Sequence, residues 1–330
     1  MTKAPIRKVV VNWPAWDGRV QEQASREGYG HLEITVTGDR AVTLASLREA
    51  DAVLAAGWDA EQLEAGANLK WVHAVSGGVE AHLFPEMVAS PLPFTCGKPT
   101  FGIPGAEWSL SVMLMVTRRN HFAIGRPKTT YLAGSADDNL LPEDLAGKAV
   151  GILGMGYMGK ALAPRAAALG MRVLAATRTP RPTDDGVFES FTADRLPEFL
   201  AESDFLVVAL PVTPQTKGMV AGPVFENMKD SAFVIDASAR ATLFDWPALV
   251  RAIDGGNIGG FCTQPSGLHP DLGMPGIESD FWQRDNVFVS PCRTTSNEQV
   301  AAGLDLFFEN MRRFEAGEEM LGIVDRKAGY

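Results

Sequence analysis

The sequence has few cysteines, no long apolar run and no excess of positive charge. Its three cysteines, Cys96, Cys262 and Cys292, are odd in number and widely spaced, which argues against a disulfide framework or a Cys-x-x-Cys metal site, so we expect no metal centre. No stretch approaches the roughly 18 apolar residues that a membrane-spanning helix needs. The formal net charge of −10 disfavours nucleic acid and anionic membranes as partners.

The N-terminal segment also lacks the apolar core of a signal peptide, because Met1 to Lys8 leads directly into a short apolar run. The hydrophobic content of 46% is typical of a globular protein, and 330 residues exceed what one core comfortably supports. We therefore expect a reduced, cytoplasmic protein of two domains.

Short apolar runs alternate with helical segments along most of the chain, which predicts an α/β fold with two doubly wound domains. Proline and glycine residues between Pro91 and Pro104 indicate a crossing between the domains, and a long apolar helix begins near Gly105. The last helix is expected at 297–314. The expected strands are 7–11, 31–36, 52–55, 71–75, 149–153, 172–175, 205–210, 232–236, 258–261 and 287–289, and the first domain's helices are 42–49 and 60–66.

Three glycines, Gly154, Gly156 and Gly159, form a G-x-G-x-x-G motif between an expected strand and an Ala-rich helical segment. In this context the first glycine allows a tight turn, and the second lets the backbone approach a pyrophosphate. The third lets the helix pack on the strand, so that its N-terminal amides can bind phosphates. The motif predicts a dinucleotide site.

The end of the next strand predicts which dinucleotide is bound. NAD sites usually place Asp or Glu there, to accept a hydrogen bond from the ribose 2′-hydroxyl. Here the strand is followed by Thr177, Arg178 and Thr179, with Arg181 close behind, and no acid occurs before Asp184. Guanidinium and hydroxyl groups bind a 2′-phosphate, which a carboxylate would repel. We expect NADP(H), with NAD as the less favoured cofactor.

Several motifs in the right order resemble the D-isomer-specific 2-hydroxyacid dehydrogenase family, and most closely its NADP-using glyoxylate/hydroxypyruvate reductase branch. The resemblance implies a discontinuous substrate domain (1–100 and 297–330), a dinucleotide domain (101–296), an active site in the cleft between them, and a homodimer formed through the long helix. The expected activity is hydride transfer between the nicotinamide and a small 2-oxo or 2-hydroxy acid. The matching stretches are 69–80, 106–108, 145–148, the glycine motif, 210–218, 228–240 and 310–330.

The resemblance also implies roles for individual residues. The backbone amides of Ser76, Gly77, Gly78 and Val79 would hold the substrate carboxylate, and Arg240 would bind the carboxylate and carbonyl oxygen and stabilise developing charge. The remaining expected cofactor contacts are Tyr157 and Met158 in the glycine motif, Leu210, Pro211 and Thr216 beside the ribose and phosphates, Ala239, and Gln264.

Three catalytic positions depart from the family pattern. The family's Asp is Gln264 here, its Glu-Pro is His269-Pro270, and its Pro-His is Pro291-Cys292. In one interpretation His269 has become the proton donor, facing Cys292. In another, imidazole activates the Cys292 thiolate as a nucleophile. A third interpretation is an inert pair.

The changed pair leaves a second class of function open, in which the protein keeps the NADP site but acts as a non-redox, lyase-like enzyme or as a ligand sensor. The loop from Gln264 to Trp282 is longer than is usual in the family, so Glu278 is a further candidate for the site. His73 lies just before the Ser76 loop, where a partly buried strand histidine is the simpler interpretation. His31, His82 and His121 have no local signature and receive no role.

Overall fold

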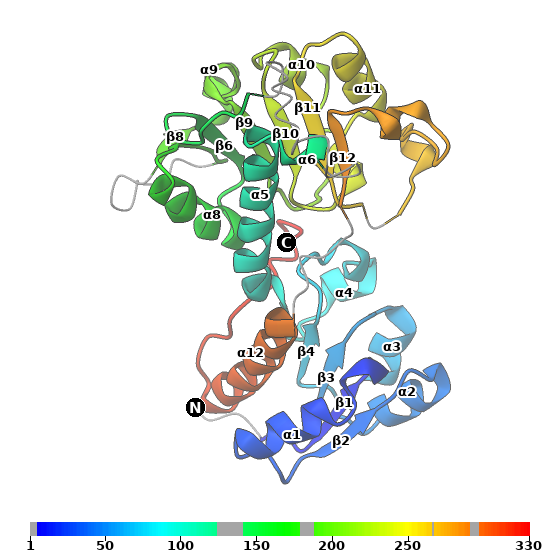
Figure 1. The fold of residues 1–330 in the computed structure, drawn as a ribbon. Helices are drawn as coiled ribbons and strands as arrows, with labels where there is room; N and C mark the ends of the chain where they lie inside the picture. The colour runs from blue at the N-terminus through cyan, green and yellow to red at the C-terminus, as the bar shows by residue number, and fades with distance from the viewer. Residues whose placement is uncertain (1–4, 124–140, 179–187, 266, 291–296) are drawn as a thin grey trace. The chain divides into compact units, whose positions relative to one another are not determined.

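The computed structural model describes residues 5–123, 141–178, 188–265, 267–290 and 297–330 (Figure 1). They form two compact units, which are described separately below. Unit 1 comprises Met1–Phe101 and Thr295–Tyr330, and unit 2 comprises Gly102–Thr294. Within the described ranges, no helix is long and apolar enough to cross a membrane.

Unit 1 is built on a five-stranded parallel sheet in the order β2-β1-β3-β4-β5. Successive side chains of a strand point to opposite faces, so Val9 and Val11 join the core under α1 and α12, whereas Val10 joins the core under α2, α3 and α4. The elements are β1 (Lys8–Val11), α1 (Arg19–Arg26), β2 (Glu33–Val36), α2 (Arg40–Leu47), β3 (Ala52–Ala55), α3 (Ala60–Ala65), β4 (Trp71–Ala74), α4 (Pro85–Ala89), β5 (Phe94–Cys96) and α12 (Asn297–Ala316).

Unit 2 is built on a seven-stranded parallel sheet in the order β12-β11-β10-β9-β6-β7-β8, with helices on both faces (Figure 1). Helices α5 and α8 pack on one face and α9, α10 and α11 on the other. The elements are α5 (Gly102–Thr117), α6 (Asn120–Ala123), β6 (Ala149–Leu153), α8 (Tyr157–Ala168), β7 (Arg172–Ala176), β8 (Glu189–Phe191), α9 (Leu196–Glu202), β9 (Phe205–Val208), α10 (Gly222–Glu226), β10 (Phe233–Asp236), α11 (Trp246–Asp254), β11 (Gly260–Thr263) and β12 (Val287–Val289).

The predicted α/β class with two parallel sheets is confirmed, but the prediction of individual strands was incomplete. The strand expected at 258–261 lies at Gly260–Thr263, because β11 pairs with β10 from Phe233↔Gly260 onwards. Two edge strands were missed. The strand β5 lies within the proline- and glycine-rich crossing, and β8 has only three residues, so both depend on pairing with β4 and β7 rather than on a local pattern.

His73 lies in the core of unit 1 and is only 1% exposed. Thr95 Oγ1 accepts a hydrogen bond from Trp71 Nε1 at 2.8 Å and lies 2.8 Å from His73 Nδ1. The hydroxyl hydrogen is therefore available to Nδ1, which favours a neutral ring protonated at Nε2. Burial lowers the pKa of His73 to about 3. The residue is a structural part of the core rather than a solvent-accessible catalytic group.

Because His73 is buried in its neutral form, the free energy of unfolding should fall as the pH drops from about 6.5 towards 3. Above this window neither state binds the proton, and the stabilisation is complete. Within this window the unfolded chain binds a proton that the folded chain excludes. The free energy of unfolding therefore falls by up to about 1.4 kcal/mol per pH unit. Urea unfolding at about pH 7.5 and about pH 5 should show this loss, and His73→Asn should show a smaller one. Equal losses in the two proteins would contradict the assignment.

Candidate active site

The loop between β6 and α8 in unit 2 is shaped by its glycines. Gly154 has φ +107°, and a Cβ there would lie 2.7 Å from Ala209 O. A Cβ at Gly159 would lie 2.4 Å from Gly154 O, whereas one at Gly156, the residue before the first turn of α8, would meet nothing within 4 Å. The fold therefore needs two of the glycines. The third faces open space, as expected where a ligand approaches the backbone.

The carboxyl end of the neighbouring strand β7 carries no acid. Thr177 N donates to Phe191 O at 3.0 Å, which ties this end to β8, and Arg178 is exposed directly after it. The other two residues predicted to contact a 2′-phosphate, Thr179 and Arg181, lie outside the described residues. The part that is described fits a phosphate better than a ribose hydroxyl.

The loop after β9 is held by its own threonines. Thr216 Oγ1 donates to Pro211 O at 2.7 Å, and Thr213 N donates to Thr216 Oγ1 at 2.8 Å. This arrangement fixes Leu210, Pro211 and Thr216 at the same edge of the sheet as the glycine loop, because β6 and β9 are adjacent and parallel.

A buried carboxylate shapes the turn that precedes Arg240. Asp236 ends β10 and accepts hydrogen bonds from Ser238 Oγ at 2.6 Å and Thr263 Oγ1 at 2.9 Å. The backbone N–H groups of Ala239 and Arg240 also donate to it. Burial raises the pKa of Asp236, and these hydrogen bonds oppose that rise. Sequence reasoning missed Asp236, although an acid at the end of an apolar strand was its visible signal.

Gln264, directly after β11, is fully buried. Of the residues that the structure describes, it alone leaves two buried polar atoms, Nε2 and Oε1, without a hydrogen-bond partner. Leaving a buried polar group unpaired costs about 1–3 kcal/mol. An amide retained at this cost, beside the strand end that carries Asp236, is suited to a ligand with both a donor and an acceptor.

The structure describes one member of the predicted acid/base pair. His269 is partly buried and precedes the short 3₁₀ helix Pro270–Leu272, whose Leu272 N donates to His269 O at 3.0 Å. Cys292 lies outside the described residues. Ser290, just before that segment, is within 3.1 Å of Trp108 Nε1, which donates to its hydroxyl.

The predicted anion loop Ser76–Val79 belongs to unit 1 and follows β4. Ser76 Oγ donates to Gly78 O at 2.7 Å within the loop, and Gly97 N donates to Ser76 O at 3.0 Å, which ties the start of the loop to the residue after β5. His82 Nε2 lies 3.3 Å from Ser76 Oγ. No sequence signal marked His82, because the contact depends on the loop folding back over the next turn.

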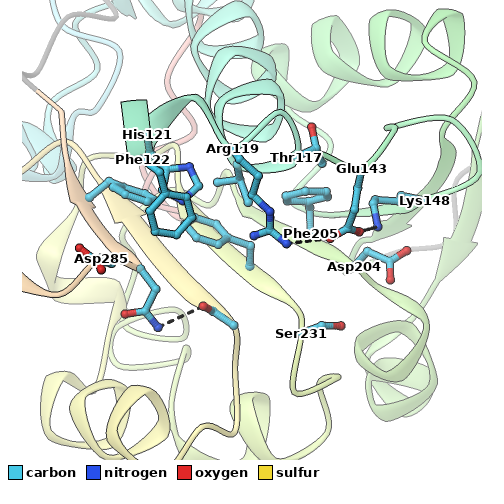
Figure 2. Close-up of a pocket in the computed structure, with 15 residues that line it drawn as sticks. Thr117, Arg119, His121, Phe122, Glu143, Lys148, Asp204, Phe205, Ser231 and Asp285 are labelled. Carbon is cyan, nitrogen blue, oxygen red and sulfur yellow. Dashed lines mark hydrogen bonds and ion pairs between the residues drawn. The ribbon is translucent and has the colours of Figure 1, made fainter. Parts of the chain in front are cut away.

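A separate pocket of unit 2 lies at the opposite edge of the sheet, near the amino ends of β6, β9, β10, β11 and β12 (Figure 2). Three of its charged groups, Arg119, Glu143 and Lys148, pair with one another. Glu143 accepts from Arg119 Nη2 at 3.0 Å and from Lys148, whose hydrogen bond is the main reason that the pKa of Glu143 is lowered. None of the predicted site residues lines this pocket, so we place the candidate site at the carboxyl edge.

The turn before Arg240 predicts an unusual response to glycine. Ala239 has φ +56°, a left-handed conformation that costs an L-residue roughly 1–2 kcal/mol. Ala239→Gly removes this cost along with one methyl group, whereas Ala237→Gly removes an equally buried methyl from ordinary backbone. Ala239→Gly should therefore be more stable than Ala237→Gly by about 1–2 kcal/mol in urea unfolding. Equal stability of the two variants would show that the turn is not strained.

A known protein family matches most of unit 2. The model of the D-isomer specific 2-hydroxyacid dehydrogenase NAD binding domain matches residues 110–292. A glyoxylate/hydroxypyruvate reductase A of Photorhabdus laumondii is 29% identical over 290 residues, covering 82% of this chain and 84% of its own. A glycerate dehydrogenase of Methylorubrum extorquens is 41% identical over 177 residues, covering 53% of this chain and 52% of its own.

Solved structures resemble the whole chain. An NADPH-dependent glyoxylate/hydroxypyruvate reductase of Sinorhizobium meliloti, in complex with NADP and sulfate, has a TM-score of 0.79 and 25% identity and covers 98% of this chain and 100% of its own. A D-isomer specific 2-hydroxyacid dehydrogenase of Xanthobacter autotrophicus, in complex with NADPH and MES, has a TM-score of 0.79 and 26% identity, covering 99% and 100%. With a family model matched over more than half of its 330 residues, the chain belongs to the D-isomer specific 2-hydroxyacid dehydrogenase family.

Proposed function

We propose that this protein is an NADPH-dependent oxidoreductase that interconverts a small 2-oxo acid and its 2-hydroxy acid. The observation that carries the proposal is the carboxyl edge of the unit 2 sheet. There the glycine loop follows β6, Arg240 follows β10, and the unpaired Gln264 follows β11. A nicotinamide cofactor would supply the hydride that adds to C2 of the oxo acid, and a proton must reach the carbonyl oxygen.

The residues present at this edge fit a phosphorylated dinucleotide. The open space at Gly156 and the start of α8, with Tyr157, Met158 and Gly159, suit a pyrophosphate. Thr177 and Arg178, with Thr179 and Arg181 beyond them in sequence, suit the 2′-phosphate of NADP. Solved relatives in complex with NADP and NADPH support this choice over NAD. Leu210, Pro211, Thr216 and Ala239 would complete the cofactor contacts.

Gln264 would hold the nicotinamide end. In a doubly wound sheet of this order, a dinucleotide spans the carboxyl edge on both sides of the strand that carries the glycine loop. Because the 2′-phosphate is assigned to the β7 side, the nicotinamide belongs on the side of β9, β10 and β11. A carboxamide has one acceptor oxygen and two donor hydrogens, which match the two unpaired groups of Gln264.

The substrate would be held by its carboxylate and its carbonyl oxygen. Unit 1 would contribute the backbone amides of Ser76, Gly77, Gly78 and Val79, and unit 2 would contribute Arg240. The guanidinium carries a permanent charge in a planar fork, which suits a 2-oxo carboxylate and stabilises negative charge as it develops on the carbonyl oxygen.

His269 would donate the proton to that oxygen during reduction and take it back during oxidation. A neutral thiol at Cys292 would be the poorer acid at neutral pH, because an ordinary cysteine has a pKa near 8.5. In this proposal Cys292 occupies the family's histidine position without carrying the proton.

We further propose a cytoplasmic homodimer in which α5 contacts a second copy of the chain. Ile103 and Leu114 are 53% and 40% exposed and, with Leu110, lie along one face of this helix. The two described cysteines are unpaired, as expected in a reducing compartment. Light scattering that reports a monomer would rule out the dimer.

Two substitutions distinguish the contacts to the cofactor's pyrophosphate from the contacts to its 2′-phosphate. Gly156→Ala should fold normally, because its Cβ meets nothing within 4 Å, yet it should weaken NADPH and NADH alike by at least about tenfold. Arg178→Ala should weaken NADPH by about tenfold or more and leave NADH nearly unchanged, since charge-assisted hydrogen bonds contribute about 1.5–3 kcal/mol. Binding can be followed by cofactor fluorescence. An equal effect of Arg178→Ala on both cofactors would contradict the NADP assignment.

The reaction itself is tested by following NADPH oxidation with glyoxylate, hydroxypyruvate and a panel of other 2-oxo acids. His269→Gln should lower kcat by about 100-fold or more, which is typical for loss of a general acid, whereas Cys292→Ser should retain most of the activity. Loss only with Cys292→Ser, together with alkylation of that thiol, would instead indicate covalent chemistry. No turnover on any acid of the panel would reject the proposed function.

A further inference from the structure

His82 lies beside the predicted anion loop of unit 1, in contact with Ser76, and the proposed function gives it no role. It ends the 3₁₀ helix Glu80–His82, which directly follows the loop, and it is 7% exposed. Its ring contacts the ring of Phe94 edge-on, with centroids 6.4 Å apart. Unlike His73, which faces one hydroxyl in a sealed core, His82 has a possible hydrogen-bond acceptor beside each ring nitrogen.

These two neighbours constrain the protonation of His82. Nε2 lies 3.3 Å from Ser76 Oγ, and Nδ1 lies 3.5 Å from Trp58 O. Ser76 uses its hydroxyl hydrogen to donate to Gly78 O at 2.7 Å, so its oxygen can only accept from His82. The Trp58 carbonyl can also only accept. A neutral imidazole has one N–H and satisfies one of the two, whereas an imidazolium satisfies both.

Burial opposes the charged form. It lowers the pKa of His82, while the Trp58 carbonyl and the negative charge of Glu80 act in the opposite direction. The acceptors of an imidazolium are thus already in place around a ring that burial keeps neutral. A negative charge bound in the adjoining loop would shift this balance towards the protonated form.

We propose that His82 is a positioning residue of the Ser76–Val79 loop that takes up a proton when the loop binds a carboxylate. Protonated His82 donates to Ser76 Oγ and to Trp58 O, fixes the Ser76 hydroxyl on Gly78 O, and places a positive charge behind the loop amides. The inference rests on the proposed function, in which this loop holds the substrate carboxylate.

Linkage fixes the direction of the pH dependence. The pKa of His82 lies below its ordinary value when the loop is empty and rises when the anion binds. Carboxylate affinity is therefore greatest below the pKa that His82 has in the empty loop. It falls as the pH rises from this pKa to the higher pKa of the anion-bound state, and it is lowest above the latter. Because the hydride step does not involve His82, the effect belongs to KM and not to kcat.

The experiment is calorimetric titration of oxamate, a non-reducible carboxylate, into the full chain saturated with NADPH near neutral pH. Repeating it in buffers with different protonation enthalpies gives the number of protons taken up on binding. Wild type should take up a substantial fraction of one proton. His82→Gln, whose amide can still donate to Ser76, should take up clearly fewer protons than wild type and bind oxamate about fivefold more weakly. The matched control is His31→Gln, because His31 is an exposed histidine of the same unit and its loss should change neither quantity.

Ser76→Ala provides a second test on a partly buried loop residue, in case His82→Gln does not fold. It removes the hydroxyl that links His82 to the loop and should reduce proton uptake and flatten the pH dependence of KM. Oxamate binding without proton uptake in wild type, or undiminished uptake in His82→Gln, would overturn the role of His82 but not the proposed function. Failure of oxamate to bind wild type, together with no turnover of 2-oxo acids, would overturn the proposed function and this inference with it.

Discussion

The close packing of α8 on β6 is the constraint from which the arrangement of the unit 2 edge follows. A side chain at Gly159 would place its Cβ 2.4 Å from Gly154 O, and one at Gly154 would approach to 2.7 Å the carbonyl oxygen of Ala209, which directly follows the neighbouring strand β9. The helix therefore starts after a short glycine loop at the end of the strand, with the backbone amides of its first turn unpaired within the helix. Only the position between these contacts, Gly156, remains open.

The buried polar side chains at this edge differ in how many of their hydrogen bonds the protein itself provides. Asp236 receives hydrogen bonds from two hydroxyls and two backbone N–H groups, so its buried carboxylate is committed to holding the turn before Arg240. Gln264 ends the neighbouring strand and is equally buried, yet neither end of its amide is paired. A protein gains no stability from such an amide. The contrast separates a residue that supports the fold from one that we propose binds a ligand.

The sequence predicted those parts of the candidate site that depend only on residues close together in the chain. The glycine spacing and the lack of an acid after β7 can each be recognised from a few consecutive residues, because the turn and the strand end require those residue types directly. The unpaired state of Gln264 and the pairing of His82 with Ser76 depend on which groups other segments bring near them. The short strands β5 and β8 were missed for the same reason, since their neighbours rather than their composition make them strands.

Two of the three positions that depart from the family pattern change the electrostatics in one direction. Where the family has an aspartate and a glutamate, this chain has the neutral amide of Gln264 and the imidazole of His269. Removing two carboxylates from the surroundings of an anionic substrate removes repulsion that is worth several kcal/mol per close pair at an effective dielectric of about 20. It also removes the acid that orients the family's histidine. In the proposed site, binding of the anion and supply of the proton would be separate tasks: Arg240 would give a permanent positive charge, His82 would give one conditional on the bound anion, and proton transfer would be left to His269.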